Sequence, residues 1–175
     1  MPEVLSPRLP GELRAALEGS LVFTVVRHPL TRLVSAYRDK LSPSSPPSWA
    51  RSSLCSRLGR GGGTCRLSWP EFVHHLLSTP PSLYDSHWAP LSHHCQPCQV
   101  SYDLVMKVET LQSDWEVLRR ISGRELPELK HLNNNQNDQG TYRDFISQLS
   151  TQTLEKLYQI YRLDFELFGY SLDFY

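Results

Sequence analysis

An apolar, largely β-branched run that passes at once into a helix start is the feature that most limits the fold of this chain. The run is Leu21-Val-Phe-Thr-Val-Val26, and Arg27-His-Pro29 ends it. Apolar side chains on both faces of a strand indicate a sheet covered by helices. Proline cannot continue a central strand but fits the first turn of a helix. The sequence therefore predicts a buried strand over residues 21–26 and a helix from residue 29.

Apolar residues at helical spacing predict that helix and three others. A short amphipathic helix is expected over residues 10–19, and one with a broad apolar face over residues 154–168. Ser68-Trp-Pro-Glu71 supplies a capping box for a helix that must stop near Pro80. The helix from residue 29 carries a buried stripe of Leu30, Leu33, Val34, Tyr37 and Leu41.

A second strand-helix unit follows in the later half of the chain. Tyr102–Val108 is expected to be a strand, Ser113-x-x-Glu116 to be a second capping box, and Gly123 to close the helix. Two such units imply an α/β layer with a parallel sheet. Two strands are too few for a complete doubly wound domain. Either further strands lie in the irregular middle, or the chain begins part-way into its fold.

The domain organisation is expected to be one domain over residues 1–175. Residues 42–66 are rich in Ser, Pro and Gly and are expected to form a surface insertion. No apolar run reaches the ~18 residues of a membrane helix. The first residues also lack the basic and apolar regions of a signal peptide.

The charges balance, since Lys plus Arg and Asp plus Glu each number 18. No overall field therefore attracts nucleic acid or an acidic membrane surface. Any site for an anion must be local.

The four cysteines leave two interpretations open. Cys55, Cys65, Cys95 and Cys98 could form disulfides in an oxidising compartment or a four-thiolate zinc site in a reducing one. Cys95-Gln-Pro-Cys98 has the spacing of half a zinc site, but Cys55 and Cys65 are too far apart for the usual second half. Disulfides are the favoured interpretation, and no metal is expected.

Arg27 and Ser35 are candidates for binding an anion. An Arg at the end of a strand lies at the usual ligand edge of an α/β sheet, where the following helix start directs free N–H groups. Ser35 lies about two turns into the helix, and its hydroxyl could contact the same anion. On physical grounds alone, a salt-bridged surface Arg and a Ser bonded to backbone are also compatible with this pattern.

Longer strings in the chain resemble one known family. Phe23-Thr-Val-Val-Arg27-His-Pro-Leu-Thr-Arg32-Leu-Val-Ser35 closely resembles the 3′-phosphate-binding motif of the Golgi carbohydrate sulfotransferases, which include chondroitin and dermatan 4-O-sulfotransferases. Three more segments resemble that family in the same order. They are His87-Trp-x-Pro90 with Cys95-x-Pro-Cys98, Tyr102-Asp-Leu-Val-Met-Lys107-Val-Glu109-Thr-Leu, and the segment from Leu157 to Tyr170.

The resemblance implies a partial three-layer, P-loop-like sulfotransferase fold with a parallel sheet flanked by helices. It also implies transfer of sulfate from 3′-phosphoadenosine 5′-phosphosulfate to a glycan hydroxyl, the acceptor being chondroitin, dermatan or an N-glycan. No nucleic-acid partner is implied, and the implied location is the Golgi lumen or membrane, through an anchor outside this chain. The nucleotide-binding residues it implies are Arg27, His28, Pro29, Leu30, Thr31, Arg32, Leu33, Val34 and Ser35.

One family element is missing from the sequence. In the family, a Lys-x-Gly-Cys-Thr loop holds the sulfate end of the donor, and this chain contains no such string. The chain is therefore expected to be N-terminally truncated and to turn over weakly or not at all. The alternatives are a catalytically inactive nucleotide-binding fragment of the same family and, behind it, a zinc-stabilised interaction module.

Other residues carry hypotheses about roles. His87 is the candidate catalytic base, although a structural His packed on Trp88 is the favoured interpretation of the pattern. Asp85 could orient His87 or be a turn residue. Lys107 and Glu109 are expected to share one face of a strand, as a ligand edge or a surface ion pair. Arg32 could add charge near the nucleotide or face solvent.

Overall fold

The computed structural model describes residues 10–46, 48–60, 65–129 and 138–172. The chain divides into two compact units. The first comprises Met1–Val26 with Pro97–Lys130, and the second comprises Arg27–Gln96 with His131–Tyr175. No helix in the described ranges has both the length and the apolar character needed to cross a membrane.

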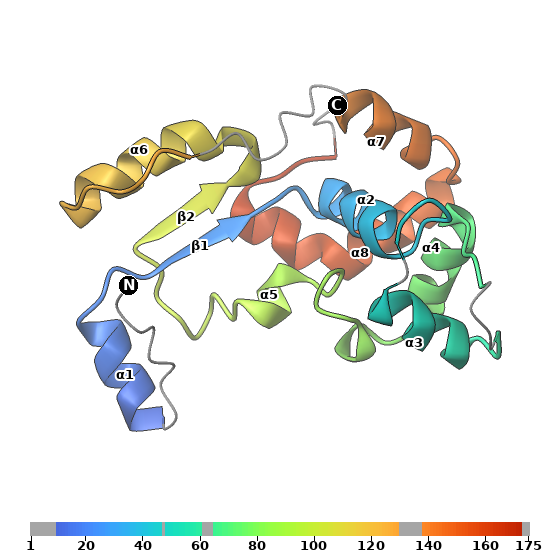
Figure 1. Ribbon diagram of the computed structural model, residues 1–175, viewed down its shortest axis with the longest axis horizontal. Coiled ribbons are helices and arrows are strands. Elements are labelled where there is room, and N and C mark those ends of the chain that lie inside the picture. The colour runs from blue at the N-terminus through green and yellow to red at the C-terminus, as the bar shows by residue number, and fades with distance from the viewer. Residues whose placement is uncertain (1–9, 47, 61–64, 130–137, 173–175) are drawn as a thin grey trace. The chain divides into compact units, whose positions relative to one another are not determined.

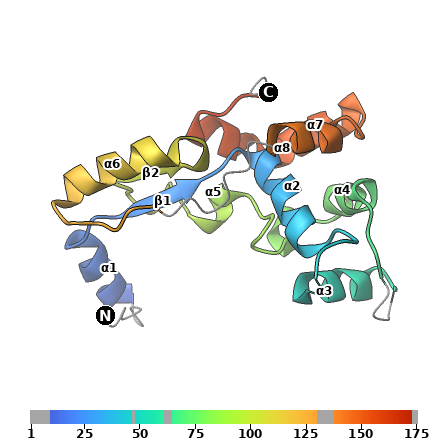
Figure 2. The same cartoon turned by 45° about the horizontal axis from the view of Figure 1, so that its top comes forward.

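The first unit contains a two-stranded parallel sheet beside a helix. Strands β1 and β2 pair in parallel, with Phe23 opposite Leu104 and Val26 opposite Lys107, which confirms the predicted parallel pairing. Helix α6 runs back along β2 in both views (Figures 1 and 2). The elements are α1 (Pro10–Glu18), β1 (Phe23–Val26), β2 (Leu104–Lys107), the 3₁₀ turn η2 (Val108–Thr110) and α6 (Leu111–Ser122).

Several side chains of the sheet are more exposed, among the described residues, than the apolar run predicts. Val26 and Met106 are buried, but Phe23 is 45% exposed, Val25 41% and Val105 40%. Within the described residues the sheet has only two strands. The described residues are thus mostly helical with a small parallel sheet, and the three-layer arrangement implied by the resemblance stays a prediction. A run of apolar residues indicates that a strand is suited to burial, but it does not indicate which helices lie on the sheet.

Helix α6 is capped differently from the prediction. It begins before the proposed box at Ser113–Glu116, so that Ser113 lies inside the helix. The carboxylate of Asp114 instead accepts hydrogen bonds from the Lys107 backbone N–H at 2.8 Å and from the Thr110 hydroxyl at 2.7 Å. Gly123 closes the helix with a φ of 60°, as predicted, because a left-handed C-cap favours glycine.

The second unit is helical. Helices α7 and α8 both pack against α2 (Figures 1 and 2). The predicted helices after Pro29, before Pro80 and near the C-terminus are all confirmed. The elements are α2 (Pro29–Lys40), α3 (Trp49–Arg57), α4 (Trp69–Ser78), η1 (Pro81–Leu83), α5 (Leu91–His94), α7 (Asp138–Ile146) and α8 (Thr151–Phe168).

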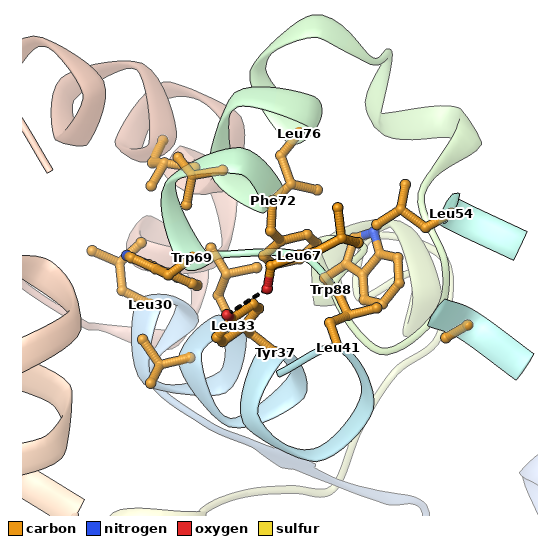
Figure 3. Packing of buried hydrophobic residues seen from close by; sticks show 14 of the residues in the cluster. Leu30, Leu33, Tyr37, Leu41, Leu54, Leu67, Trp69, Phe72, Leu76 and Trp88 are labelled. Carbon is orange, nitrogen blue, oxygen red and sulfur yellow. Dashed lines mark hydrogen bonds between the residues drawn. The ribbon is translucent and has the colours of Figure 1, made fainter. Parts of the chain in front are cut away.

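Aromatic rings from several segments form the centre of this unit (Figure 3). The ring of Phe72 on α4 is stacked on Tyr37 of α2 at 5.8 Å and meets Trp88 edge-on at 5.3 Å. The Tyr37 hydroxyl donates to the Leu67 carbonyl oxygen at 2.8 Å, so the one polar atom of that ring is satisfied inside the core. The predicted stripe on α2 is buried along its length, and so is Leu41, the C-cap of this helix.

The segment 42–66 is more than a surface excursion. It contains α3, whose Leu54 and Cys55 are each 3% exposed and belong to the core. Cys55 forms a disulfide with Cys65, which joins α3 to the start of the next helical segment. Cys95 and Cys98 form no disulfide in the part of the chain that the structure describes. The favoured disulfide interpretation is thus confirmed for one pair, and the four-thiolate zinc site is wrong because two of its ligands are consumed.

The predicted capping box at the start of α4 is present. The Glu71 carboxylate accepts from the Ser68 N–H and hydroxyl, both at 2.8 Å, and pairs with Arg60 at 2.8 Å. These contacts, led by the Ser68 backbone N–H, lower the pKa of Glu71 from 4.5 to about 2. Its carboxylate therefore stabilises the fold above pH 4.5, and this contribution is lost as the pH falls through 2.

We accordingly predict that Glu71→Ala lowers the free energy of unfolding by about 1 kcal/mol at pH 7. The penalty should shrink between pH 4.5 and pH 2, since the wild-type carboxylate then becomes protonated. Urea denaturation of both proteins across this range measures the difference. A penalty that stays constant down to pH 2 would show that the carboxylate charge does not contribute.

Candidate functional site

The start of α2 has the features of an anion-binding helix terminus. β1 ends at Val26, and His28 then takes the N-cap position with φ −49° and ψ 125°. Pro29 lies in the first turn, and no acidic side chain is present there. The first N–H groups of any helix lack an intrahelical acceptor and attract anions. Arg27 adds a partly exposed guanidinium directly before this terminus.

Most of the nine predicted nucleotide-binding residues have buried side chains, which serve the core. Arg27, Arg32 and Ser35 are the three with partly exposed side chains. Of these, Arg27 and Ser35 are the residues whose side chains are predicted to contact the phosphate. The buried set comprises His28, Pro29, Leu30, Thr31, Leu33 and Val34.

His28 anchors the start of α2 to the C-terminal segment. Its ring is fully buried, and its Nε2 lies 3.1 Å from the Ser171 carbonyl oxygen, so Nε2 donates this hydrogen bond. The ring also meets Phe165 and Tyr170 edge-on, with centroids 5.2 and 5.4 Å away. The family-like string at residues 27–35 and the family-like C-terminal segment therefore pack together.

Arg32 makes hydrogen bonds within the protein, and its contribution to the nucleotide site stays a prediction. Its guanidinium donates to the carbonyl oxygens of Ala89 at 2.8 Å and Ser86 at 2.9 Å. Burial lowers the pKa of Arg32, while Tyr161 and Asp164 nearby act in the opposite direction. Arg32 thus positions the segment that carries His87, and the guanidinium is directed at protein carbonyls.

Helix α8 also makes hydrogen bonds to the segment that carries His87. The Tyr161 hydroxyl donates to the Trp88 carbonyl oxygen at 2.6 Å, and burial raises the pKa of this phenol. The Asp164 carboxylate, 1% exposed, accepts from the backbone N–H groups of Leu91 and Ser92, both at 2.7 Å. Sequence reasoning missed these contacts. The available signal was an Asp on the apolar face of a helix, which requires polar partners when buried.

His87 and Asp85 form a hydrogen-bonded pair within this segment. The Asp85 carboxylate accepts from the His87 backbone N–H at 2.9 Å and lies 2.5 Å from Nδ1. The His87 side chain is 45% exposed and that of Asp85 only 11%. Since the carboxylate fixes the proton on Nδ1, the neutral ring presents an unprotonated Nε2. That is the tautomer a base at Nε2 requires.

The expected shared strand face of Lys107 and Glu109 is wrong. β2 ends at Lys107, and Glu109 lies in the following 3₁₀ turn η2. Because alternation of side chains applies only along a strand, the spacing of two does not place them on one face.

Comparison with known proteins extends the match beyond the motifs. A family model described as "Sulfotransferase family" matches residues 6–171. This chain belongs to the sulfotransferase family. The sulfotransferase chain is 29% identical to carbohydrate sulfotransferase 11 of Rattus norvegicus over 180 residues, which covers 94% of this chain and 51% of the relative. It is 34% identical to human carbohydrate sulfotransferase 9 over 167 residues, or 85% of this chain and 37% of the relative.

Other relatives show the same pattern of coverage. Human carbohydrate sulfotransferase 14 is 36% identical over 110 residues, or 60% of this chain and 29% of the relative. This sulfotransferase chain thus spans about half or less of the length of these relatives. No solved structure matches it.

Proposed function

We propose that this chain binds 3′-phosphoadenosine 5′-phosphosulfate through its 3′-phosphate at residues 27–35, as part of a carbohydrate sulfotransferase. The observation that carries the proposal is the start of α2, where Arg27 precedes a helix terminus without any acidic side chain. Membership of the sulfotransferase family, and relatives named as carbohydrate sulfotransferases, support this choice of ligand. A nucleotide bearing a 3′-phosphate supplies the dianion that such a terminus favours.

The proposed reaction needs a base that takes the proton of the acceptor hydroxyl. A glycan hydroxyl oxygen attacks sulfur, the bond from sulfur to the 5′-phosphate oxygen breaks, and the hydroxyl proton passes to a base. The products are a sulfate ester and 3′-phosphoadenosine 5′-phosphate. His87 is the proposed base, because Asp85 leaves its Nε2 unprotonated and the side chain is exposed. Arg32, Tyr161 and Asp164 act as positioning residues through the backbone they hold.

The proposal has two versions, an active sulfotransferase and a nucleotide-binding chain without catalysis. They differ in whether the sulfate end of the donor is held for transfer. The sequence contains no Lys-x-Gly-Cys-Thr loop to stabilise charge on the transferring group. We therefore expect at most weak turnover from this chain alone. The second candidate function, nucleotide binding without catalysis, follows from the same observation.

An assay of labelled sulfate transfer from the donor to unsulfated chondroitin distinguishes these versions. Transfer that disappears in His87→Ala supports the enzyme. A rise in melting temperature with 3′-phosphoadenosine 5′-phosphate, without transfer, supports the nucleotide-binding version. The absence of both transfer and a melting-temperature shift would contradict both versions.

The proposed location is the Golgi lumen, with chondroitin, dermatan or an N-glycan as acceptor. The disulfide between Cys55 and Cys65 supports an oxidising compartment, because such bonds persist in the secretory route and are rare in the cytosol.

A further inference from the structure

A cavity in the second unit adjoins the His87 segment. Its volume is about 150 Å³, which is room for about five water molecules. It lies between α3, α4 and residues 83–88, and it involves no residue of the predicted phosphate segment. The residues that line it are Trp49, Ala50, Ser53, Leu54, Arg57, His75, Leu83, Tyr84, Asp85 and Trp88.

Aromatic rings form much of the cavity wall. Trp88 is 5% exposed and packed on Phe72, so it is a rigid part of the core. Tyr84 is fixed by a hydrogen bond of 2.6 Å from its hydroxyl to the Leu76 carbonyl oxygen. Trp49, by contrast, is 72% exposed at the start of α3. A cavity lined by an exposed indole and by rigid aromatic rings suits a ligand with apolar C–H faces and a polar edge, as in a sugar ring.

The polar residues of the cavity set the charge of that ligand. Arg57 lies in the last turn of α3, and within the described residues it forms no ion pair. Asp85, the one acidic residue of the lining, is already engaged by His87 and only 11% exposed. Burial, followed by Arg57 and His74, lowers the pKa of His75. The guanidinium of Arg57 is therefore the available charge, and it favours a carboxylate.

We propose that this cavity binds one acidic sugar ring, a uronate residue, of the acceptor glycan. The inference rests on the proposed function, because the reason for a glycan here is the adjacent His87. Asp85 connects the two sites, since this residue lines the cavity and its carboxylate holds His87. A uronate ring in the cavity lies beside the proposed base, with its carboxylate on Arg57 and its C–H face on Trp49.

Binding of defined oligosaccharides to the full chain tests this inference. The first probe is an unsulfated chondroitin hexasaccharide, which contains uronate. The second is the same hexasaccharide with every carboxylate reduced to an alcohol. Calorimetric titration should show binding of the first about tenfold tighter than of the second, the gain expected from one charge-assisted contact.

Three variants complete the test. Arg57→Gln should abolish the difference between the two probes, whereas Trp49→Ala should weaken both by about tenfold. Arg162→Gln is the matched control, since Arg162 is exposed on α8 and outside the cavity lining, and it should change neither. Equal affinity of the wild type for both probes, or an unchanged preference in Arg57→Gln, would overturn the proposal.

The failure of this inference can be told apart from failure of the proposed function. Binding of 3′-phosphoadenosine 5′-phosphate, measured on the same samples, reports on residues 27–35 alone. Nucleotide binding without a preference for uronate refutes only the cavity assignment. Uronate preference without nucleotide binding refutes the proposed function and leaves the cavity as a glycan site.

Discussion

Asp164→Ala is expected to lower the free energy of unfolding by about 3 to 5 kcal/mol, because it removes two hydrogen bonds to a charged acceptor. The carboxylate is 1% exposed, and it accepts from Leu91 and Ser92 at 2.7 Å. Without it, two backbone N–H groups at the start of α5 lose their acceptors. The guanidinium of Arg32 also loses a nearby negative charge. Urea denaturation measures the loss.

Two further variants make this prediction specific. Asp164→Asn retains the shape and one acceptor oxygen, so its penalty should be smaller than that of Asp164→Ala. Glu155→Ala, an exposed carboxylate on the same helix, should stay within about 0.5 kcal/mol of the wild type. If Asp164→Ala were as harmless as Glu155→Ala, the His87 segment would not be held by α8 in the way described.

The second large effect concerns two leucines of α8 that differ in burial. Leu157 is fully buried in the core, whereas Leu163 is 45% exposed on the same helix. Leu157→Ala should cost about 2 to 5 kcal/mol, since it removes buried methyl groups and leaves a cavity. Leu163→Ala should cost less than about 0.5 kcal/mol. Both substitutions change helix propensity equally, and both are measured by urea denaturation.

Similar penalties for the two leucine variants would contradict the burial assigned to α8. A large penalty at Leu163 alone would show that the opposite face of the helix is the packed one.

Local signals were sufficient to predict the main helices of the second unit. Two examples are the apolar stripe from Leu30 to Leu41 and the capping box at Ser68–Glu71. Each depends only on residues that are close together in the sequence. Helix α3 was missed because Ser, Pro and Gly around it indicate a loop, while its anchors, Leu54 and the disulfide of Cys55, depend on distant packing. The local amino-acid composition around α3 does not indicate what Leu54 and Cys55 pack against.

The candidate site could be predicted in part. The position of Arg27 before a helix start follows from the sequence, because a strand and a proline define that junction. The role of Arg32 does not follow, since its partners Ser86 and Ala89 are more than fifty residues away. Asp164 is a similar case. Long-range contacts to backbone carbonyl and N–H groups leave no spacing pattern in a single sequence.

Arg27 is proposed to contact the 3′-phosphate of the nucleotide. The most direct measurement is calorimetric titration of wild type and Arg27→Ala with 3′-phosphoadenosine 5′-phosphate and with adenosine 5′-phosphate, which lacks the 3′-phosphate. Arg27→Ala should weaken the first ligand roughly 10- to 100-fold, as expected for loss of a charge-assisted contact, and leave the second unchanged. Equal weakening of both ligands, or of neither, would contradict the assignment of Arg27 to the 3′-phosphate.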